Sequence, residues 1–300
     1  MSEFVRIVEV GPRDGLQNEK TPLTLDDRRK LILDLMQTGL SAIEVGSCVS
    51  AKWVPQMAQS DELFASLPKD PNISFSLLTP NLKGFESALA VGCQEVAVFT
   101  AASESFTQKN INCSIDESFE KFADIMTAAK AHNIKVRGYV SCIVDCPYEG
   151  AIAPSKVAHV SQRLLDMGCY EVSLGETLGT ATPDRVKKVW QACLAEMDAA
   201  SLAGHFHNTY GMAIANIYQS LEQGIRVFDS SIAGLGGCPY AKGASGNVST
   251  EDLYYLLSNM GYDTGIDLDA LMIASQNISQ VLQRTNPSNY ANAYWQKRCA

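Results

Sequence analysis

Two histidines, His205 and His207, stand one residue apart at the end of a short apolar segment. If residues 202–206 form a β-strand, alternate side chains share a face and both imidazoles point to the same side. Two neighbouring imidazoles form half of many metal sites. A hydrogen-bonded pair of structural histidines is the alternative, because a motif this short also arises by chance.

Other polar side chains follow different apolar segments of the chain. Arg13 and Asp14 lie in the stretch 11–19, and Asn247 lies at the end of a glycine-rich loop. Carboxylate, imidazole and amide donors without a thiolate suit Mg²⁺ or Mn²⁺, with Zn²⁺ possible. If these segments converge, the predicted metal ligands are Asp14, His205, His207 and Asn247.

Glu44 is a carboxylate inside the apolar segment 42–45. A buried carboxylate at this position could fix the orientation of Arg13, so we predict both a structural and a functional role for it. The alternative for Arg13 is a turn ion pair with the adjacent Asp14, which would contribute little to stability.

Cys238 differs from the other eight cysteines because it lies in a loop with five glycines between Gly234 and Gly246. Such a loop is flexible and can fold over a ligand, which makes this thiol a candidate for chemistry. The loop does not fit the spacing of the common phosphate-binding motifs. The alternative is a small, buried, inert side chain.

Strands and helices are predicted to alternate along the chain. Apolar segments predict eight strands at residues 7–10, 42–45, 73–78, 95–99, 136–142, 171–174, 202–206 and 227–232. Helical spacing predicts helices at residues 24–38, 57–67, 82–91, 115–132, 155–167, 183–197, 210–223, 251–260 and 268–282.

This alternation implies parallel strands joined by right-handed crossovers, and eight such units indicate an α/β fold of the (β/α)₈ TIM-barrel type with extra C-terminal helices. An open doubly wound sheet is the rival. The barrel is favoured because polar residues follow many different strands, whereas an open sheet gathers them at one switch point. We predict one catalytic domain spanning residues 1–300.

Composition excludes several classes of protein. The net charge of −9 argues against a nucleic-acid-binding groove. No apolar run approaches the roughly 18 residues that a membrane span needs, and residues 1–6 do not resemble a secretory signal, so we expect a cytoplasmic protein without membrane contact. Nine scattered cysteines are not a disulfide framework.

Three stretches closely resemble the 3-hydroxy-3-methylglutaryl-CoA (HMG-CoA) lyase family: residues 10–19, residues 43–45 together with 52–57, and residues 233–247. The resemblance extends from about residue 5 to 280. Isopropylmalate, homocitrate and citramalate synthases are similar in the Arg-Asp and H-x-H features, but the cysteine loop is specific to the lyase. Two positions depart from the family: Glu176 stands where Asp is frequent, and residues 295–300 do not match the family's regulatory cysteine.

The resemblance implies cleavage of HMG-CoA to acetyl-CoA and acetoacetate, with a divalent cation, Mg²⁺ or Mn²⁺, as cofactor. It implies that Asp14 or His205 takes the hydroxyl proton, that Arg13 held by Glu44 stabilises the thioester enolate, and that Cys238 protonates it. The implied catalytic residues are therefore Arg13, Asp14, Glu44, His205 and Cys238. Substrate contacts are expected from Arg13, Gln17, Asn110 and Arg137, and CoA phosphate contacts from Lys20, Lys52, Lys83 or Arg137.

Three alternatives remain open. A synthase would condense acetyl-CoA with a 2-keto acid and would not need Cys238. A lyase could accept a longer branched 3-hydroxyglutaryl-CoA, and a non-catalytic barrel could only bind acyl-CoA. The family resemblance also implies a homodimer.

Overall fold

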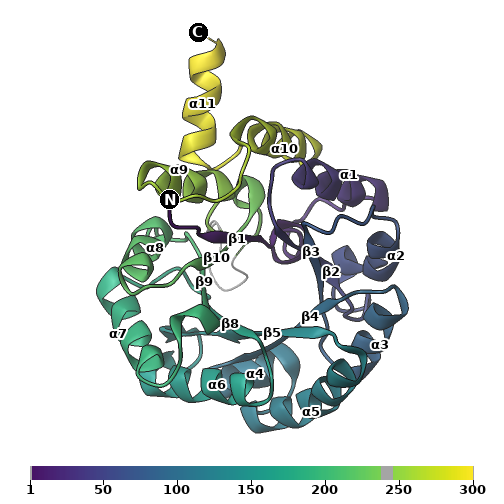
Figure 1. The fold of residues 1–300 in the computed structure, drawn as a ribbon, viewed down its shortest axis with the longest axis vertical. Coiled ribbons are helices and arrows are strands. Elements are labelled where there is room, and N and C mark those ends of the chain that lie inside the picture. The colour runs from purple at the N-terminus through teal and green to yellow at the C-terminus, as the bar shows by residue number, and fades with distance from the viewer. Residues whose placement is uncertain (1, 238–245, 300) are drawn as a thin grey trace.

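In the computed structural model, which describes residues 2–237 and 246–299, eight parallel strands close into a barrel inside a ring of helices (Figure 1). The order around the barrel is β1-β10-β9-β8-β5-β4-β3-β2. The TIM-barrel prediction is therefore confirmed. The barrel strands are β1 (Arg6–Glu9), β2 (Ala42–Ser47), β3 (Ser74–Leu78), β4 (Glu95–Ala101), β5 (Lys135–Ser141), β8 (Glu171–Glu176), β9 (Leu202–Phe206) and β10 (Val227–Ser230).

The helices of the ring pack their apolar side chains against the strands. In α1 (Leu25–Met36), Thr24 and Asp27 form a capping box, and Leu31, Ile32 and Leu35 are buried. The other helices are α2 (Ser60–Ala65), α3 (Leu82–Ala90), α4 (Glu104–Ile111), α5 (Ile115–His132), α6 (Pro154–Asp166), α7 (Pro183–Leu194), α8 (Ala213–Glu222), α9 (Thr250–Asn259), α10 (Leu268–Val281) and α11 (Asn289–Cys299).

Some elements differ from the sequence prediction. The helix predicted at residues 57–67 is divided into a 3₁₀ turn, η2 (Pro55–Met57), and α2, because Gln59 has a left-handed backbone with φ 58°. The helices α4 and α11 were not predicted, nor was the small hairpin of β6 (Asp145–Cys146) and β7 (Gly150–Ala151). Helix α11 projects outward from the ring (Figure 1).

Short turns follow β1 and β10. A single π-helical turn, η1 (Gly11–Gly15), follows β1, and a 3₁₀ turn, η4 (Ile232–Gly234), follows β10. Within η4, Ala233 has φ 52°, which is unusual for a residue with a side chain. Both turns lie at the carboxyl ends of adjacent strands, which is the end of a TIM barrel that carries functional residues.

Among the described residues, no helix combines the length and hydrophobicity needed to cross a membrane.

Candidate metal centre

The turn η1 presents Arg13 and Asp14 to the mouth of the barrel. The Val10 carbonyl accepts hydrogen bonds from the backbone N–H groups of Arg13 and Gly15, both at 3.1 Å, and this closes the turn directly after β1. Arg13 then contacts two carboxylates: its Nε lies 2.6 Å from Glu44 Oε2, and its Nη1 lies 2.6 Å from Asp14 Oδ1. The predicted pairing of Arg13 with Glu44 is therefore present.

His205 and His207 lie together at the end of β9. Their ring centroids are 5.4 Å apart, and each residue is only 8% exposed. One donor atom from each histidine and one carboxylate oxygen of Asp14 lie within 4.8 Å of one another. The strand periodicity therefore places both imidazoles on one face, beside the carboxylate that follows β1.

Asn247 completes the predicted set. Its Nδ2 donates to Asp14 Oδ2 at 2.8 Å and to the Leu235 carbonyl at 3.2 Å, and its backbone forms a β-bridge with His207. All four residues predicted as metal ligands thus lie in one cluster at the mouth of the barrel. Whether they bind a metal remains a proposal.

Hydrogen bonds define which ring nitrogens face this cluster. Nδ1 of His205 lies 3.1 Å from Asp229 Oδ2, within hydrogen-bond distance, and Nε2 faces Asp14 Oδ2 at 4.0 Å. The His207 ring donates to the Thr177 backbone, and among the described residues its buried Nδ1 has no hydrogen-bond partner. Burial and the neighbouring His205 lower the pKa of His207 to about 4, so its imidazole is neutral at pH 7.

The carboxylate of the cluster is ionised at neutral pH. Burial alone would raise the pKa of Asp14, but Arg13, His205 and His207 outweigh this effect and hold the pKa at about 2. A carboxylate oxygen, an unpartnered neutral imidazole nitrogen and a second imidazole lone pair are the donors that a divalent cation requires. The residues of this site therefore fit such a cation.

Two residues that the sequence analysis missed contact this cluster. Asp229, on β10, bonds to His205, and Tyr139, on β5, lies edge-on to the His205 ring at 6.5 Å between centroids. The Arg13 guanidinium lies over the Tyr139 ring at 5.4 Å. An acid inside the apolar segment 227–232 was the available signal for Asp229, as it was for Glu44.

The prediction for Arg137 needs a correction. A CoA phosphate contact requires a place at the mouth of the barrel, but Arg137 is the third residue of β5 and only 2% exposed. Its guanidinium donates to Glu171, Tyr139 and Asp229 at 2.7–2.8 Å. These bonds occupy all three of its nitrogens, so Arg137 is not placed to bind a CoA phosphate.

Four other predicted binding residues do not belong to the cluster of Asp14, His205, His207 and Asn247. Gln17 is half-buried just after η1, and Asn110 is exposed near the end of α4. Lys20 and Lys52 are exposed. The roles of these four residues remain predictions, and Cys238 lies outside the described residues.

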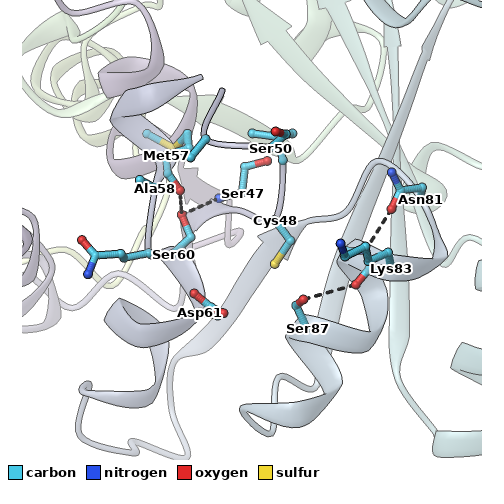
Figure 2. Close-up of a pocket in the computed structure, with 14 residues that line it drawn as sticks. Ser47, Cys48, Ser50, Met57, Ala58, Ser60, Asp61, Asn81, Lys83 and Ser87 are labelled. Carbon is cyan, nitrogen blue, oxygen red and sulfur yellow. Dashed lines mark hydrogen bonds between the residues drawn. The ribbon is translucent and has the colours of Figure 1, made fainter. Parts of the chain in front are cut away.

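Lys83 lines a cavity of about 300 Å³ between the segments that follow β2 and β3. Lys83 and Asn81 lie on one side of this cavity, and Ser60 and Asp61 lie on the other (Figure 2). Of the basic residues predicted to contact CoA, Lys83 is the one that lines this cavity.

Comparisons with known proteins identify the family of this chain. The sequence model of the HMGL-like family matches residues 4–278. The 3-hydroxy-3-isohexenylglutaryl-CoA/hydroxy-methylglutaryl-CoA lyase of Pseudomonas aeruginosa is 56% identical over 289 residues, which cover 96% of each chain. The crystal structure of a hydroxymethylglutaryl-CoA lyase from Pseudomonas aeruginosa has a TM-score of 0.97 at 55% identity and 99% coverage of both chains.

A further solved structure contains ligands. It is an HMG-CoA lyase from Acinetobacter baumannii in complex with coenzyme A and 3-methylmalate. This chain is 36% identical to it with a TM-score of 0.92, and the match covers 97% of this chain and 95% of the other.

Proposed function

Since the chain belongs to the HMGL-like family, we propose that it is a C–C lyase that cleaves HMG-CoA to acetyl-CoA and acetoacetate. The observation that carries this proposal is the cluster of Asp14, His205 and His207 donor atoms within 4.8 Å, directly beside Arg13. Relatives over half identical along nearly the whole chain are lyases of this kind. Leucine degradation is the expected metabolic setting.

We propose that Asp14, His205, His207 and Asn247 hold a divalent cation, Mg²⁺ or Mn²⁺. When bound, this cation supplies Lewis acidity that lowers the pKa of a hydroxyl chelated to it. In the Asn247 side chain, Nδ2 already donates to Asp14 and Leu235, which leaves the amide oxygen to face the cation.

The protein side chains then move protons and stabilise charge. The C3 hydroxyl proton passes to Asp14 or His205. The Asp14 carboxylate keeps lone pairs that can accept it, whereas the Nε2 lone pair of His205 faces the cation and its Nδ1 is bonded to Asp229. As the C2–C3 bond breaks, its electron pair enters the thioester enolate of acetyl-CoA. Arg13, fixed by Glu44, stabilises that oxyanion, and Cys238 donates a proton to the enolate carbon.

A longer branched substrate is a second candidate. The relative from Pseudomonas aeruginosa carries the name of a 3-hydroxy-3-isohexenylglutaryl-CoA lyase as well as of an HMG-CoA lyase. The same cluster and the same arginine would serve both substrates, because the chemistry at C2 and C3 is unchanged. A condensing synthase lacks comparable support from these relatives.

The test uses the purified full-length protein with HMG-CoA, with an isohexenyl analogue, and with acetyl-CoA plus several 2-keto acids. We expect cleavage of HMG-CoA that disappears after exhaustive chelation and returns with Mg²⁺ or Mn²⁺. Full activity in a metal-free sample would contradict the cation proposal, and condensation without cleavage would favour a synthase.

We further propose one catalytic domain, a homodimer and a cytoplasmic location. Sedimentation of the purified protein and fractionation of cells test the last two. An acyl-CoA is the expected partner, and neither nucleic acid nor a membrane is expected to bind.

A further inference from the structure

A line of buried charged side chains continues from His205 into the interior of the barrel. Asp229 Oδ2 accepts hydrogen bonds from His205 Nδ1 at 3.1 Å and from Ser173 Oγ at 2.7 Å. Its other oxygen, Oδ1, lies 2.8 Å from Arg137 Nη2. The Asp229 side chain is fully buried, so both of its oxygens are committed to these three partners.

Arg137 is itself held in place by several neighbours. Its Nε lies 2.7 Å from Glu171 Oε1, and its Nη1 donates to the Tyr139 hydroxyl at 2.8 Å. The other oxygen of Glu171 forms an ion pair with Arg6. The planar guanidinium therefore has one available orientation, in which Nη2 points at Asp229.

We infer that Asp229 and Arg137 are positioning residues that fix the tautomer and the ring orientation of His205, and that through this they set its affinity for a divalent cation. A neutral imidazole carries its proton on either nitrogen, and the hydrogen bond at one nitrogen decides which. An ionised Asp229 only accepts, so it keeps the proton on Nδ1 and leaves the Nε2 lone pair facing Asp14. Arg137 acts through Asp229 and touches neither cation nor substrate.

This inference rests on the proposed cation site. The alternative is a purely structural role, in which the Arg137, Asp229 and Glu171 side chains only pack the interior of the barrel. In that case, loss of the Asp229 charge would lower stability. Its effect on cation affinity would be no larger than the effect of removing another nearby carboxylate. The two readings therefore differ in a quantity that can be measured without turnover.

The experiment measures Mn²⁺ affinity by calorimetry for wild type, Asp229→Asn and the matched control Glu171→Gln. Both variants convert a buried carboxylate on Arg137 to an amide, but only Asp229 contacts His205. An amide at 229 can donate to Nδ1, which moves the ring proton to Nε2, so we expect 10- to 100-fold weaker Mn²⁺ binding, the usual effect of such partners. Glu171→Gln should bind Mn²⁺ close to wild type.

Each outcome has a separate meaning. If wild type binds no Mn²⁺, the cation proposal itself fails. If wild type binds and Asp229→Asn binds equally well, or if both variants weaken binding equally, the positioning role is wrong. Should Asp229→Asn not fold, ¹⁵N spectra of histidine-labelled wild type decide: His205 must carry its proton on Nδ1, and a proton on Nε2 overturns the inference.

Discussion

Two groups of buried carboxylates in this barrel differ in the partners that they contact. In the interior, Glu44, Asp229 and Glu171 each face an arginine at 2.6–2.8 Å. Beside the turn η4, Glu9 and Glu251 are equally buried, yet among the described residues no cation forms an ion pair with either. Glu9 accepts from the N–H groups of Gly11 and Ile232 and from the Thr250 hydroxyl at 2.6–2.9 Å.

This difference in partners corresponds to a difference in role: one group orients charged side chains, and the other holds turns together. An ion-pair partner lowers the pKa of a buried carboxylate and so favours the ionised form, which can orient a cation or an arginine. Neutral donors counter the effect of burial less strongly. Burial raises the pKa of Glu9 to about 8, although Thr250 and the two backbone N–H groups oppose the shift. Because Glu9 accepts from Gly11 in η1 and from Ile232 in η4, it joins the turn that carries Arg13 and Asp14 to η4.

The largest effect is expected at the interior arginine. Arg137→Met leaves the Asp229 and Glu171 carboxylates without their shared cation, and removal of one partner from a buried pair costs about 3–5 kcal/mol. Urea denaturation of the variant measures this loss. If the free energy of unfolding falls by less than about 1 kcal/mol, the Asp229 and Glu171 carboxylates do not need an ion-pair partner, which is the situation of Glu9.

Arg13→Lys should come next. Lysine keeps the charge but cannot contact Glu44 and Asp14 together through a planar fork, so we expect turnover to fall by about 10²–10³, or about 2.7–4 kcal/mol. Steady-state kinetics with HMG-CoA should show little change in KM. An unchanged kcat would contradict the charge-stabilising role.

Glu9→Gln tests the neutral side of the comparison. Because the folded pKa of about 8 exceeds the ordinary value of 4.5, the stability that this group contributes is present below pH 4.5 and is lost as pH rises through 8. Wild type should therefore lose stability relative to Glu9→Gln between pH 6 and 9, by at least about 1.4 kcal/mol, the equivalent of one pKa unit. Thermal melts of both proteins across this range measure it, and a constant difference would show that Glu9 is ionised throughout.

The smallest effect is expected at the rim. Arg185 and Asp145 form a two-contact ion pair at 2.6–2.7 Å, but the arginine side chain is 38% exposed. Solvent screening should limit the loss in Arg185→Ala to about 1 kcal/mol or less. A loss as large as that of Arg137→Met would mean that burial is not what distinguishes the interior pairs.

The sequence predicted the barrel and the convergence of its polar residues because both follow from periodicity. Eight strands were predicted, and every ligand candidate lay near the end of a strand or in the segment after it. It did not identify Asp229 or Tyr139, since their partners lie on other strands and pairing across a barrel leaves no local pattern. Arg137 was misplaced because alternation along β5 shows which face a residue takes, but not its depth in the barrel. Helix α4 was missed because it lies within the connection between β4 and the much longer helix α5.

The backbone conformation of Ala233 limits which amino acids this position can accept. Its left-handed backbone is held by Glu251, whose oxygens accept from the Ala233 N–H at 3.1 Å, and by Arg284, which donates to the Ala233 carbonyl at 2.7 Å. Glycine adopts this conformation without steric cost, whereas β-branched side chains are strongly disfavoured there. In a saturation library selected for lyase activity, position 233 should therefore retain alanine and glycine and lose valine, isoleucine and threonine, although Ala233 is not among the proposed catalytic or binding residues.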